Sequence, residues 1–406
     1  MISGRRGALL SLIFISILHG VNHTYGIFLS PLNEEMRRFF EVETISTITS
    51  FKTTYLMIYA ASNLVFGLLT NRISSRWTLG IGGLLNAAVV AAYAFIGPLG
   101  IPYMHVLWAA SGAAAGTYHP VANALITRLY AGRKGWALGI TGLGASTGFA
   151  FGPLLTGVLS KSCGFNWMQV ALVFGAVGAA CSAAVLFTVS DVPHEDPPKT
   201  ATPSDAPAAR NGTGALAVFL TIVVIAVGMR EMAIWGVMDI TDFFVSRAHR
   251  TSAAGYLFLL FLPGIAVQPL AGAMSDRAPR HLVAAGALLL HGASTALMPL
   301  ASLRLLFLPF LLLGIGQAAS VPTVEAYMAD YTTPRNRGIV FGVVVTAGLG
   351  IGSLGPLLSG MLVDHLGGTV HAYNVCLYGL GSLTGAAAVI MLFSNAAGRL
   401  LGLKQE

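Results

Sequence analysis

The feature that most restricts the fold of this chain is a series of twelve apolar segments, each long enough to cross a bilayer. A transmembrane helix needs about 20 predominantly apolar residues. A helix also satisfies its own backbone hydrogen bonds, which lipid cannot do. The segments lie at roughly 7–30, 45–70, 78–97, 102–126, 134–160, 166–190, 214–240, 252–273, 281–302, 304–328, 337–364 and 370–396. The sequence therefore predicts an all-α membrane protein with twelve transmembrane helices.

Composition supports a membrane protein and argues against other classes. Only 10% of the 406 residues are charged, whereas soluble domains have about 25%. The net charge of +7 lies in short loops between apolar segments, so we expect the lipid bilayer, and not nucleic acid, as a partner. The chain has no phosphate-binding loop, catalytic triad or CxxC motif, and no soluble domain long enough to hold one. We therefore expect no enzyme activity and no cofactor.

A polar gap separates the sixth and seventh apolar segments. Residues 191–213 contain five prolines and charges of both signs, with too little apolar content to pack into a core. Such a composition predicts a flexible linker. We expect this linker to be cytoplasmic and to join a six-helix bundle at 1–190 to a second six-helix bundle at 214–406.

The basic residues predict the orientation. Fifteen of the 23 Lys and Arg residues lie in segments that face one side, six face the other, and two lie inside helices. Cytoplasmic loops carry the excess of positive charge. We therefore expect a multi-pass protein of the cell inner (plasma) membrane, with both termini in the cytoplasm.

The two halves carry related glycine patterns, which suggests that one is a diverged copy of the other. In the first half, Gly112 and Gly116 precede Gly148 and Gly152-Pro153, and in the second half Gly314 and Gly316 precede Gly352 and Gly355-Pro356. Glycines four residues apart allow transmembrane helices to approach closely. We expect two pseudo-symmetric bundles.

This layout resembles that of the major facilitator transporters, which consist of two related six-helix halves. That family has a Gly-x-x-x-Asp-Arg turn between the second and third helices of each half. The second half here matches it at Gly272-Ala-Met-Ser-Asp276-Arg277-Ala-Pro-Arg280, whereas the first half has Asn71 where the acid is expected. The resemblance implies alternating access and a cytoplasmic gate held by charged contacts. The residues assigned to gating and bending are Asn71, Arg72, Arg76, Gly152, Pro153, Asp276, Arg277, Arg280, Asp330, Arg335, Arg337, Gly355 and Pro356.

The sequence resembles two different branches of that family. The stretches that begin at Tyr25-Gly26 and at Arg133-Lys134-Gly135 look like monocarboxylate transporters. That branch usually carries an Asp and an Arg on helix eight, where this chain has Gly264 and Gln268. His119-Pro120 instead resembles the fosmidomycin-resistance branch of drug exporters.

Polar residues inside the apolar segments are the candidates for solute binding and coupling, because polar and charged groups are costly in lipid. His19 and His23 are four residues apart and therefore share one helical face. Arg230 and Glu231 are adjacent, so their side chains leave the helix about 100° apart and cannot both face the centre of a cavity. The candidates are His19, Asn22, His23, Lys52, Tyr118, His119, Asn123, Arg230, Glu231, Gln317 and Glu325.

The charges of this set favour an anionic or zwitterionic solute over a cation. We expect a monomeric secondary transporter that moves a small organic anion, such as a monocarboxylate, with or in exchange for protons. Glu231, Glu325 or a histidine would carry the proton. The alternative is proton-driven efflux of drugs or toxic compounds.

A transition-metal transporter is a further alternative. Imidazole nitrogens suit divalent transition metals, and His19, His23 and His119 could supply three of them. No carboxylate or thiolate is placed to complete such a site, so we assign no metal ligands from the sequence.

Overall fold

The computed structural model describes residues 5–70, 72–97, 100–191, 213–332 and 337–403, and no strand occurs among them. Among the described residues, nine spans are continuous helices: α1 (Arg5–Ile27), α3 (Ile45–Leu69), α4 (Ser75–Ala92), α7 (Lys134–Cys163), α8 (Trp167–Thr188), α9 (Thr213–His249), α12 (Arg280–Leu297), α13 (Phe307–Ala329) and α16 (Val370–Leu400). Three further spans are interrupted: α5 (Ile101–Ala115) with α6 (Tyr118–Leu129), α10 (Ala254–Phe261) with α11 (Gly264–Ser275), and α14 (Arg337–Gly352) with α15 (Leu354–His365). The prediction of an all-α protein with twelve spans is confirmed.

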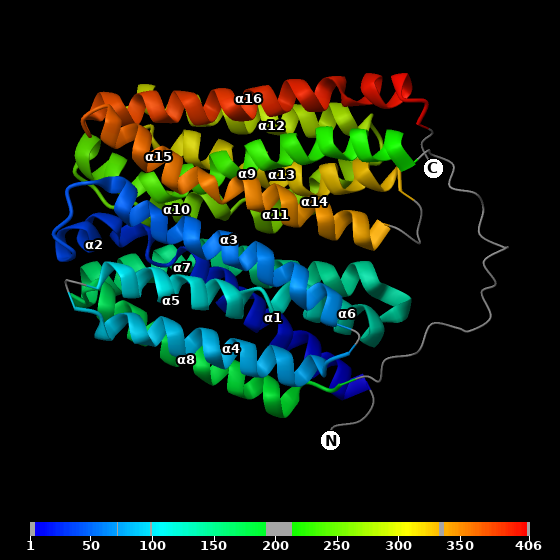
Figure 1. Ribbon diagram of the computed structural model, residues 1–406, viewed down its shortest axis with the longest axis horizontal. Coiled ribbons are helices and arrows are strands. Elements are labelled where there is room, and N and C mark those ends of the chain that lie inside the picture. The colour runs from blue at the N-terminus through cyan, green and yellow to red at the C-terminus, as the bar shows by residue number, and fades with distance from the viewer. Residues whose placement is uncertain (1–4, 71, 98–99, 192–212, 333–336, 404–406) are drawn as a thin grey trace.

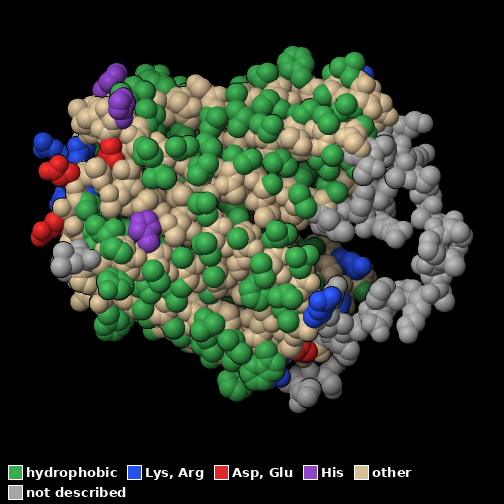
Figure 2. All heavy atoms as spheres, viewed as in Figure 1, with side chains coloured by type: hydrophobic (Ala, Val, Ile, Leu, Met, Phe, Trp, Pro, Cys, Tyr) green, Lys and Arg blue, Asp and Glu red, His purple; other side chains and the backbone are tan. Residues whose placement is uncertain are grey.

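Within the part of the chain that the structure describes, ten helical stretches are long and apolar enough to cross a membrane by length and composition. The two spans outside this group have identifiable reasons. The α3 helix contains Lys52 and seven Ser or Thr residues, which lower its hydropathy. The span made of α5 and α6 carries Tyr, His, Asn, Ser, Thr and Arg residues, which lower its hydropathy. Figure 2 shows hydrophobic side chains over the middle of the molecule and most charged side chains towards its two ends, as a bilayer-spanning surface requires.

A proline accompanies each interruption. Pro120 lies in the first turn of α6, Pro263 lies between α10 and α11, and Pro356 lies in the first turn of α15. Proline has no backbone N–H and its ring clashes with the carbonyl four residues earlier, so it ends or bends a helix. The interruption before α6 places Tyr118 and His119 at the start of a helix, in the middle of a span.

The helices run roughly parallel along the long axis of the molecule (Figure 1). In that view α1 to α8 lie together in the lower part and α9 to α16 in the upper part. The α1 helix packs against α7 and α8, and α9 packs against α14 and α16. The two parts meet where α3 contacts α14 and α15, and where α7 contacts α10. Residues 192–212 lie outside the described residues, so the division of the chain at 191–213 stays a prediction.

The two parts are joined tightly at the end that carries the short helix α2 (Asn33–Phe39), at the left of Figure 1. The Asn33 amide donates to the Asp239 backbone carbonyl at 2.8 Å, and the Glu34 N–H donates to the Asp242 carboxylate at 2.9 Å. Asp364 accepts hydrogen bonds from the first two backbone N–H groups of α3, at 2.7 and 2.8 Å. A carboxylate is stabilised there by the free N–H groups and dipole of a helix N-terminus. We call this the closed end.

Candidate functional site

Three histidines meet in the interior of the α1–α8 part. His19 and His23 come from α1, and His119 comes from α6. The Nε2 atoms of His19 and His23 are 3.0 Å apart. The His119 ring centroid is 4.9 Å from that of His19 and 5.3 Å from that of His23. His19 is buried, whereas His23 and His119 are half-buried.

Two contacts orient His19. Its Nδ1 lies 2.7 Å from the Thr141 carbonyl of α7. That oxygen can only accept, so Nδ1 carries the proton and Nε2 of the neutral ring presents a lone pair. The Tyr118 ring stacks on His19 with centroids 4.5 Å apart, and its hydroxyl donates to the Ile15 carbonyl at 2.8 Å. Three helices therefore hold His19 in one orientation, with a basic nitrogen directed at His23.

An arginine and a glutamate form the polar centre of the α9–α16 part. Arg230 Nη2 donates to the Glu231 carboxylate, and Arg230 Nη1 donates to the Ser320 hydroxyl at 3.3 Å. Trp235 Nε1, one helical turn along α9, donates to the other Glu231 oxygen at 3.1 Å. Arg230 is buried and Glu231 is half-buried. The side chains of these adjacent residues leave the helix in different directions, but the length of Arg230 allows it to reach back to Glu231.

Aromatic rings connect the two polar centres. The Phe149 ring of α7 lies 4.3 Å from the His23 ring between centroids, 4.7 Å from Phe261 and 6.2 Å from Trp235. Tyr59 of α3 approaches His119 at 6.2 Å. The histidines and the Arg230–Glu231 pair thus lie on opposite sides of one aromatic wall at the meeting of the two parts. We did not predict the aromatic members, because an aromatic residue in an apolar helix gives no signal of its facing direction.

Lys52 lies away from these centres, although the sequence grouped it with them. Its ammonium group donates to the Gly26 carbonyl and lies 3.4 Å from the Ser30 hydroxyl. It also lies 4.0 Å from the Asp239 carboxylate and 4.9 Å from the centre of the Trp108 ring. Both charged side chains are almost fully buried. Lys52 therefore links α3 to α9 at the closed end.

The other candidates are dispersed. Asn22 is buried and lines a small space with Thr117 and Tyr118 inside the α1–α8 part. Asn123, on α6, is exposed and its side chain is not part of the histidine group. On α13, Gln317 is half-buried beside the fully buried His291, and Glu325 is exposed within electrostatic reach of Arg230.

The turn residues expected to act in gating form a charged contact in the second half. Arg280, at the start of α12, donates to Asp330 at the end of α13 and to Asp276 at 3.1 Å. Arg277 is exposed. Asn71 and Arg335 lie outside the described residues, as does the side chain of Arg337.

In the first half, an acid from another part of the chain lies near the corresponding turn. Asp191, after α8, accepts from the Arg76 N–H at 3.0 Å and from the Ser74 hydroxyl at the N-terminus of α4. The Arg76 guanidinium lies 5.3 Å from the centre of the Trp77 ring, and Arg72 is exposed. Asp191 was missed because its partner turn is more than a hundred residues away in the chain.

The two Gly-Pro pairs differ in how closely the neighbouring helix approaches the glycine. A Cβ at Gly355 would lie 2.1 Å from the Met232 carbonyl of α9, so α15 and α9 meet backbone to backbone. A Cβ at Gly152 would lie 3.2 Å from the Thr24 side chain, a less severe approach. Pro153 lies inside α7 and Pro356 near the start of α15, and both are buried. Only the second pair interrupts its span.

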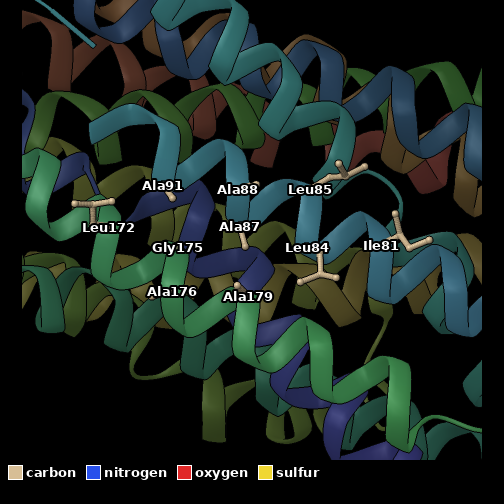
Figure 3. Close-up of a pocket in the computed structure, with 10 residues that line it drawn as sticks. All are labelled: Ile81, Leu84, Leu85, Ala87, Ala88, Ala91, Leu172, Gly175, Ala176 and Ala179. Atoms are coloured by element: carbon tan, nitrogen blue, oxygen red, sulfur yellow. The ribbon is translucent and has the colours of Figure 1, made fainter. Parts of the chain in front are cut away.

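A separate pocket lies between α4 and α8 (Figure 3). Its volume is about 560 Å³, and Ala, Gly, Leu and Ile residues alone line it, including Leu85 and Leu172, which are exposed. It offers no polar side chain to orient a polar solute. We therefore do not assign solute binding to this pocket.

Apolar spans, interrupted helices and polar side chains gathered at the junction of two related parts define a membrane transporter. The sequence matches the family model of the Major Facilitator Superfamily over residues 8–245 and 220–400. The chain belongs to this family. It is a multi-pass membrane transporter of small solutes and not an enzyme.

Curated relatives agree with the family. The chain is 24% identical to the fosmidomycin resistance protein of Escherichia coli over 322 residues, covering 77% of this chain and 76% of that protein. It is 30% identical to the multidrug resistance protein MdtG of Proteus mirabilis over 237 residues, covering 56% and 57%.

Solved structures show the same fold. A bacterial homologue of the human lysosomal transporter Spinster, in an inward-facing and unoccupied conformation, has a TM-score of 0.75 and 16% identity, covering 98% of both chains. A transporter of the POT family in complex with 5-aminolevulinic acid has a TM-score of 0.74 and 14% identity, covering 97% of this chain and 96% of that one.

Proposed function

We propose that this transporter moves a small organic anion together with protons across the cell inner membrane. The observation that carries the proposal is the Arg230–Glu231 pair beside the aromatic wall. Arginine stays charged in proteins, and its planar guanidinium binds carboxylates and other oxyanions through paired hydrogen bonds. Glu231 already occupies one edge of that guanidinium, so a solute anion and the Glu231 carboxylate compete for it.

This competition couples the solute to a proton. When Glu231 accepts a proton, its carboxyl group becomes a weaker partner for Arg230, and the guanidinium becomes available to the anion. When Glu231 releases the proton, it takes Arg230 back and the anion leaves. Solute and proton therefore bind in the same state, which is the requirement for symport.

The histidine group supplies a second place for a proton. The Nε2 lone pair of His19 accepts a hydrogen bond from His23. The Phe149 ring contacts His23 on one side and Trp235 on the other. Histidine is the side chain whose ordinary titration range is nearest to neutrality. We assign protons to Glu231 and to the histidines, and the solute to the Arg230 guanidinium beside the aromatic wall.

The arrangement of the contacts supports alternating access. The hydrogen bonds of Asn33, Glu34 and Asp364 join the two parts at the closed end. In the orientation that the basic residues predict, this end faces outward and both termini are cytoplasmic. We propose that the parts before and after 191–213 rock as two units of a monomer, and that these contacts break when the site opens to the outside.

Drug efflux is the second candidate. The aromatic wall of Phe149, Trp235 and Phe261 suits flat, apolar solutes, and aromatic residues supply much of the apolar lining of small-molecule sites. Two curated relatives are named for drug resistance. Broad resistance to unrelated lipophilic compounds on overexpression would support this function.

Uptake by reconstituted proteoliposomes distinguishes proton-coupled anion transport from drug efflux. We expect accumulation of at least one member of a panel of radiolabelled carboxylates, including pyruvate and benzoate, when the outside is made more acidic than the inside. Collapse of the pH gradient with a protonophore should abolish the accumulation. Anion uptake that ignores the gradient, together with gradient-driven movement of neutral lipophilic dyes, would favour drug efflux.

A further inference from the structure

The histidine group has the composition of a metal site as well as of a proton site. One ring nitrogen from each of His19, His23 and His119 lies within 4.8 Å of the other two. Two nitrogens bound to one tetrahedral Zn²⁺ at about 2.1 Å would be roughly 3.4 Å apart. The observed 3.0 Å between the Nε2 atoms of His19 and His23 is close to this spacing. The His119 nitrogen, within 4.8 Å of both, must rotate towards the pair to complete the site.

The orientation of His19 is the one that a metal ligand requires. Metal-bound histidines usually donate their second ring N–H to a carbonyl or carboxylate, which fixes the tautomer and raises the basicity of the ligating nitrogen. His19 has such a partner in the Thr141 carbonyl at 2.7 Å. Its Nε2 lone pair is therefore directed into the group before any ion arrives.

The exposure of the histidines and the number of protein ligands indicate which kind of metal site this group could form. His23 and His119 are half-buried, so their rings are not completely enclosed by protein atoms. The sequence argument against a metal was the lack of a fourth protein ligand. Three histidines with an open fourth position are, however, a complete protein ligand set for Zn²⁺, because water or a solute atom occupies the remaining position.

We infer that His19, His23 and His119 bind one divalent transition-metal ion of the Zn²⁺ type through three neutral imidazoles, with one coordination position open. The site lies within one part of the protein, on α1 and α6. The inference does not depend on the proposed transport of anions. Binding requires deprotonated imidazoles, as for all histidine metal sites.

The test uses the full-length purified protein with its affinity tag removed, because a histidine tag binds the same metals. Calorimetric titration with Zn²⁺ at slightly alkaline pH should show one ion per protein. Co²⁺ should give the intense visible absorption of a four-coordinate site. His23→Ala and His119→Ala should each weaken Zn²⁺ binding by at least about 100-fold, the upper range for loss of even an outer-shell partner.

A matched control is available in the same part of the protein. His105 on α5 is also half-buried, but it contacts Ser50 and Thr54 at 3.3 and 2.9 Å. His105→Ala should leave Zn²⁺ affinity and the Co²⁺ spectrum unchanged. Gel filtration and thermal unfolding identify any variant that fails to fold, and whichever of His23→Ala and His119→Ala is folded carries the test. The inference is overturned if the native protein binds no Zn²⁺, or if folded His23→Ala or His119→Ala keeps native affinity.

Discussion

Trp235 donates its indole N–H to the Glu231 carboxylate at 3.1 Å, and the other oxygen of that carboxylate accepts from Arg230. The carboxylate is thus held from two sides, and the indole ring also faces Phe149. A hydrogen bond to a charged group contributes about 1.5–3 kcal/mol. Trp235 is therefore both part of the wall and a support for Glu231.

Replacement of Trp235 by Phe keeps an aromatic ring and removes the donor. We expect Trp235→Phe to lower the free energy of unfolding by roughly 1–2 kcal/mol, measured by thermal unfolding in detergent. The effect should be smaller when Glu231→Gln is already present, since the neutral amide oxygen that remains is a weaker acceptor than the carboxylate. Equal destabilisation in both backgrounds would show that ring packing, and not the hydrogen bond, is responsible.

Lys52 and Asp239 form a buried pair at the closed end, so neither should be replaced alone. Lys52→Met leaves the Asp239 carboxylate without its ionic partner, and removal of one member of a buried pair costs roughly 3–5 kcal/mol. We expect Lys52→Met to reduce stability strongly and the double variant with Asp239→Asn to recover most of it. A Lys52→Met variant of native stability with impaired solute binding would return Lys52 to the solute site.

Gly148 lies where α7 and α1 meet backbone to backbone. A Cβ there would lie 2.0 Å from the Gly20 carbonyl, whereas a Cβ at Gly142 of the same helix meets no atom within 4 Å. We expect Gly148→Ala to lower the melting temperature. Gly142→Ala should leave it unchanged or raise it slightly, because alanine favours the helix over glycine by about 1 kcal/mol. The same shift in both variants would contradict the close contact.

The apolar segments predicted the helices well because length and hydropathy report directly on a bilayer-spanning helix. The spacing of His19 and His23 likewise placed them on one face, and their contact follows from it. For the other residues, the sequence does not show which neighbouring helix a side chain faces. Lys52 was grouped with the histidines, but its partner Asp239 lies almost two hundred residues away, so only the packing of α3 on α9 reveals the pair.

The sequence analysis also missed a side-chain pair within one helix. Glu231 and Trp235 have the four-residue spacing that brings side chains together on a helix, which could have identified Trp235. By contrast, no spacing rule links Phe149 and Phe261 with the polar residues. These aromatic members depend on the approach of α7 to α10, which is a property of the assembled fold.

The central claim is that Glu231 couples a proton to the anion by competing for Arg230. The most direct measurement compares Glu231→Gln with Glu43→Gln, an exposed carboxylate before α3, in proteoliposomes containing a transported carboxylate. Glutamine cannot release a proton and resembles the protonated acid. The account predicts that Glu231→Gln loses accumulation driven by a pH gradient but retains exchange of labelled for unlabelled anion across the membrane, while Glu43→Gln keeps both. Gradient-driven accumulation at the native level in Glu231→Gln would contradict it.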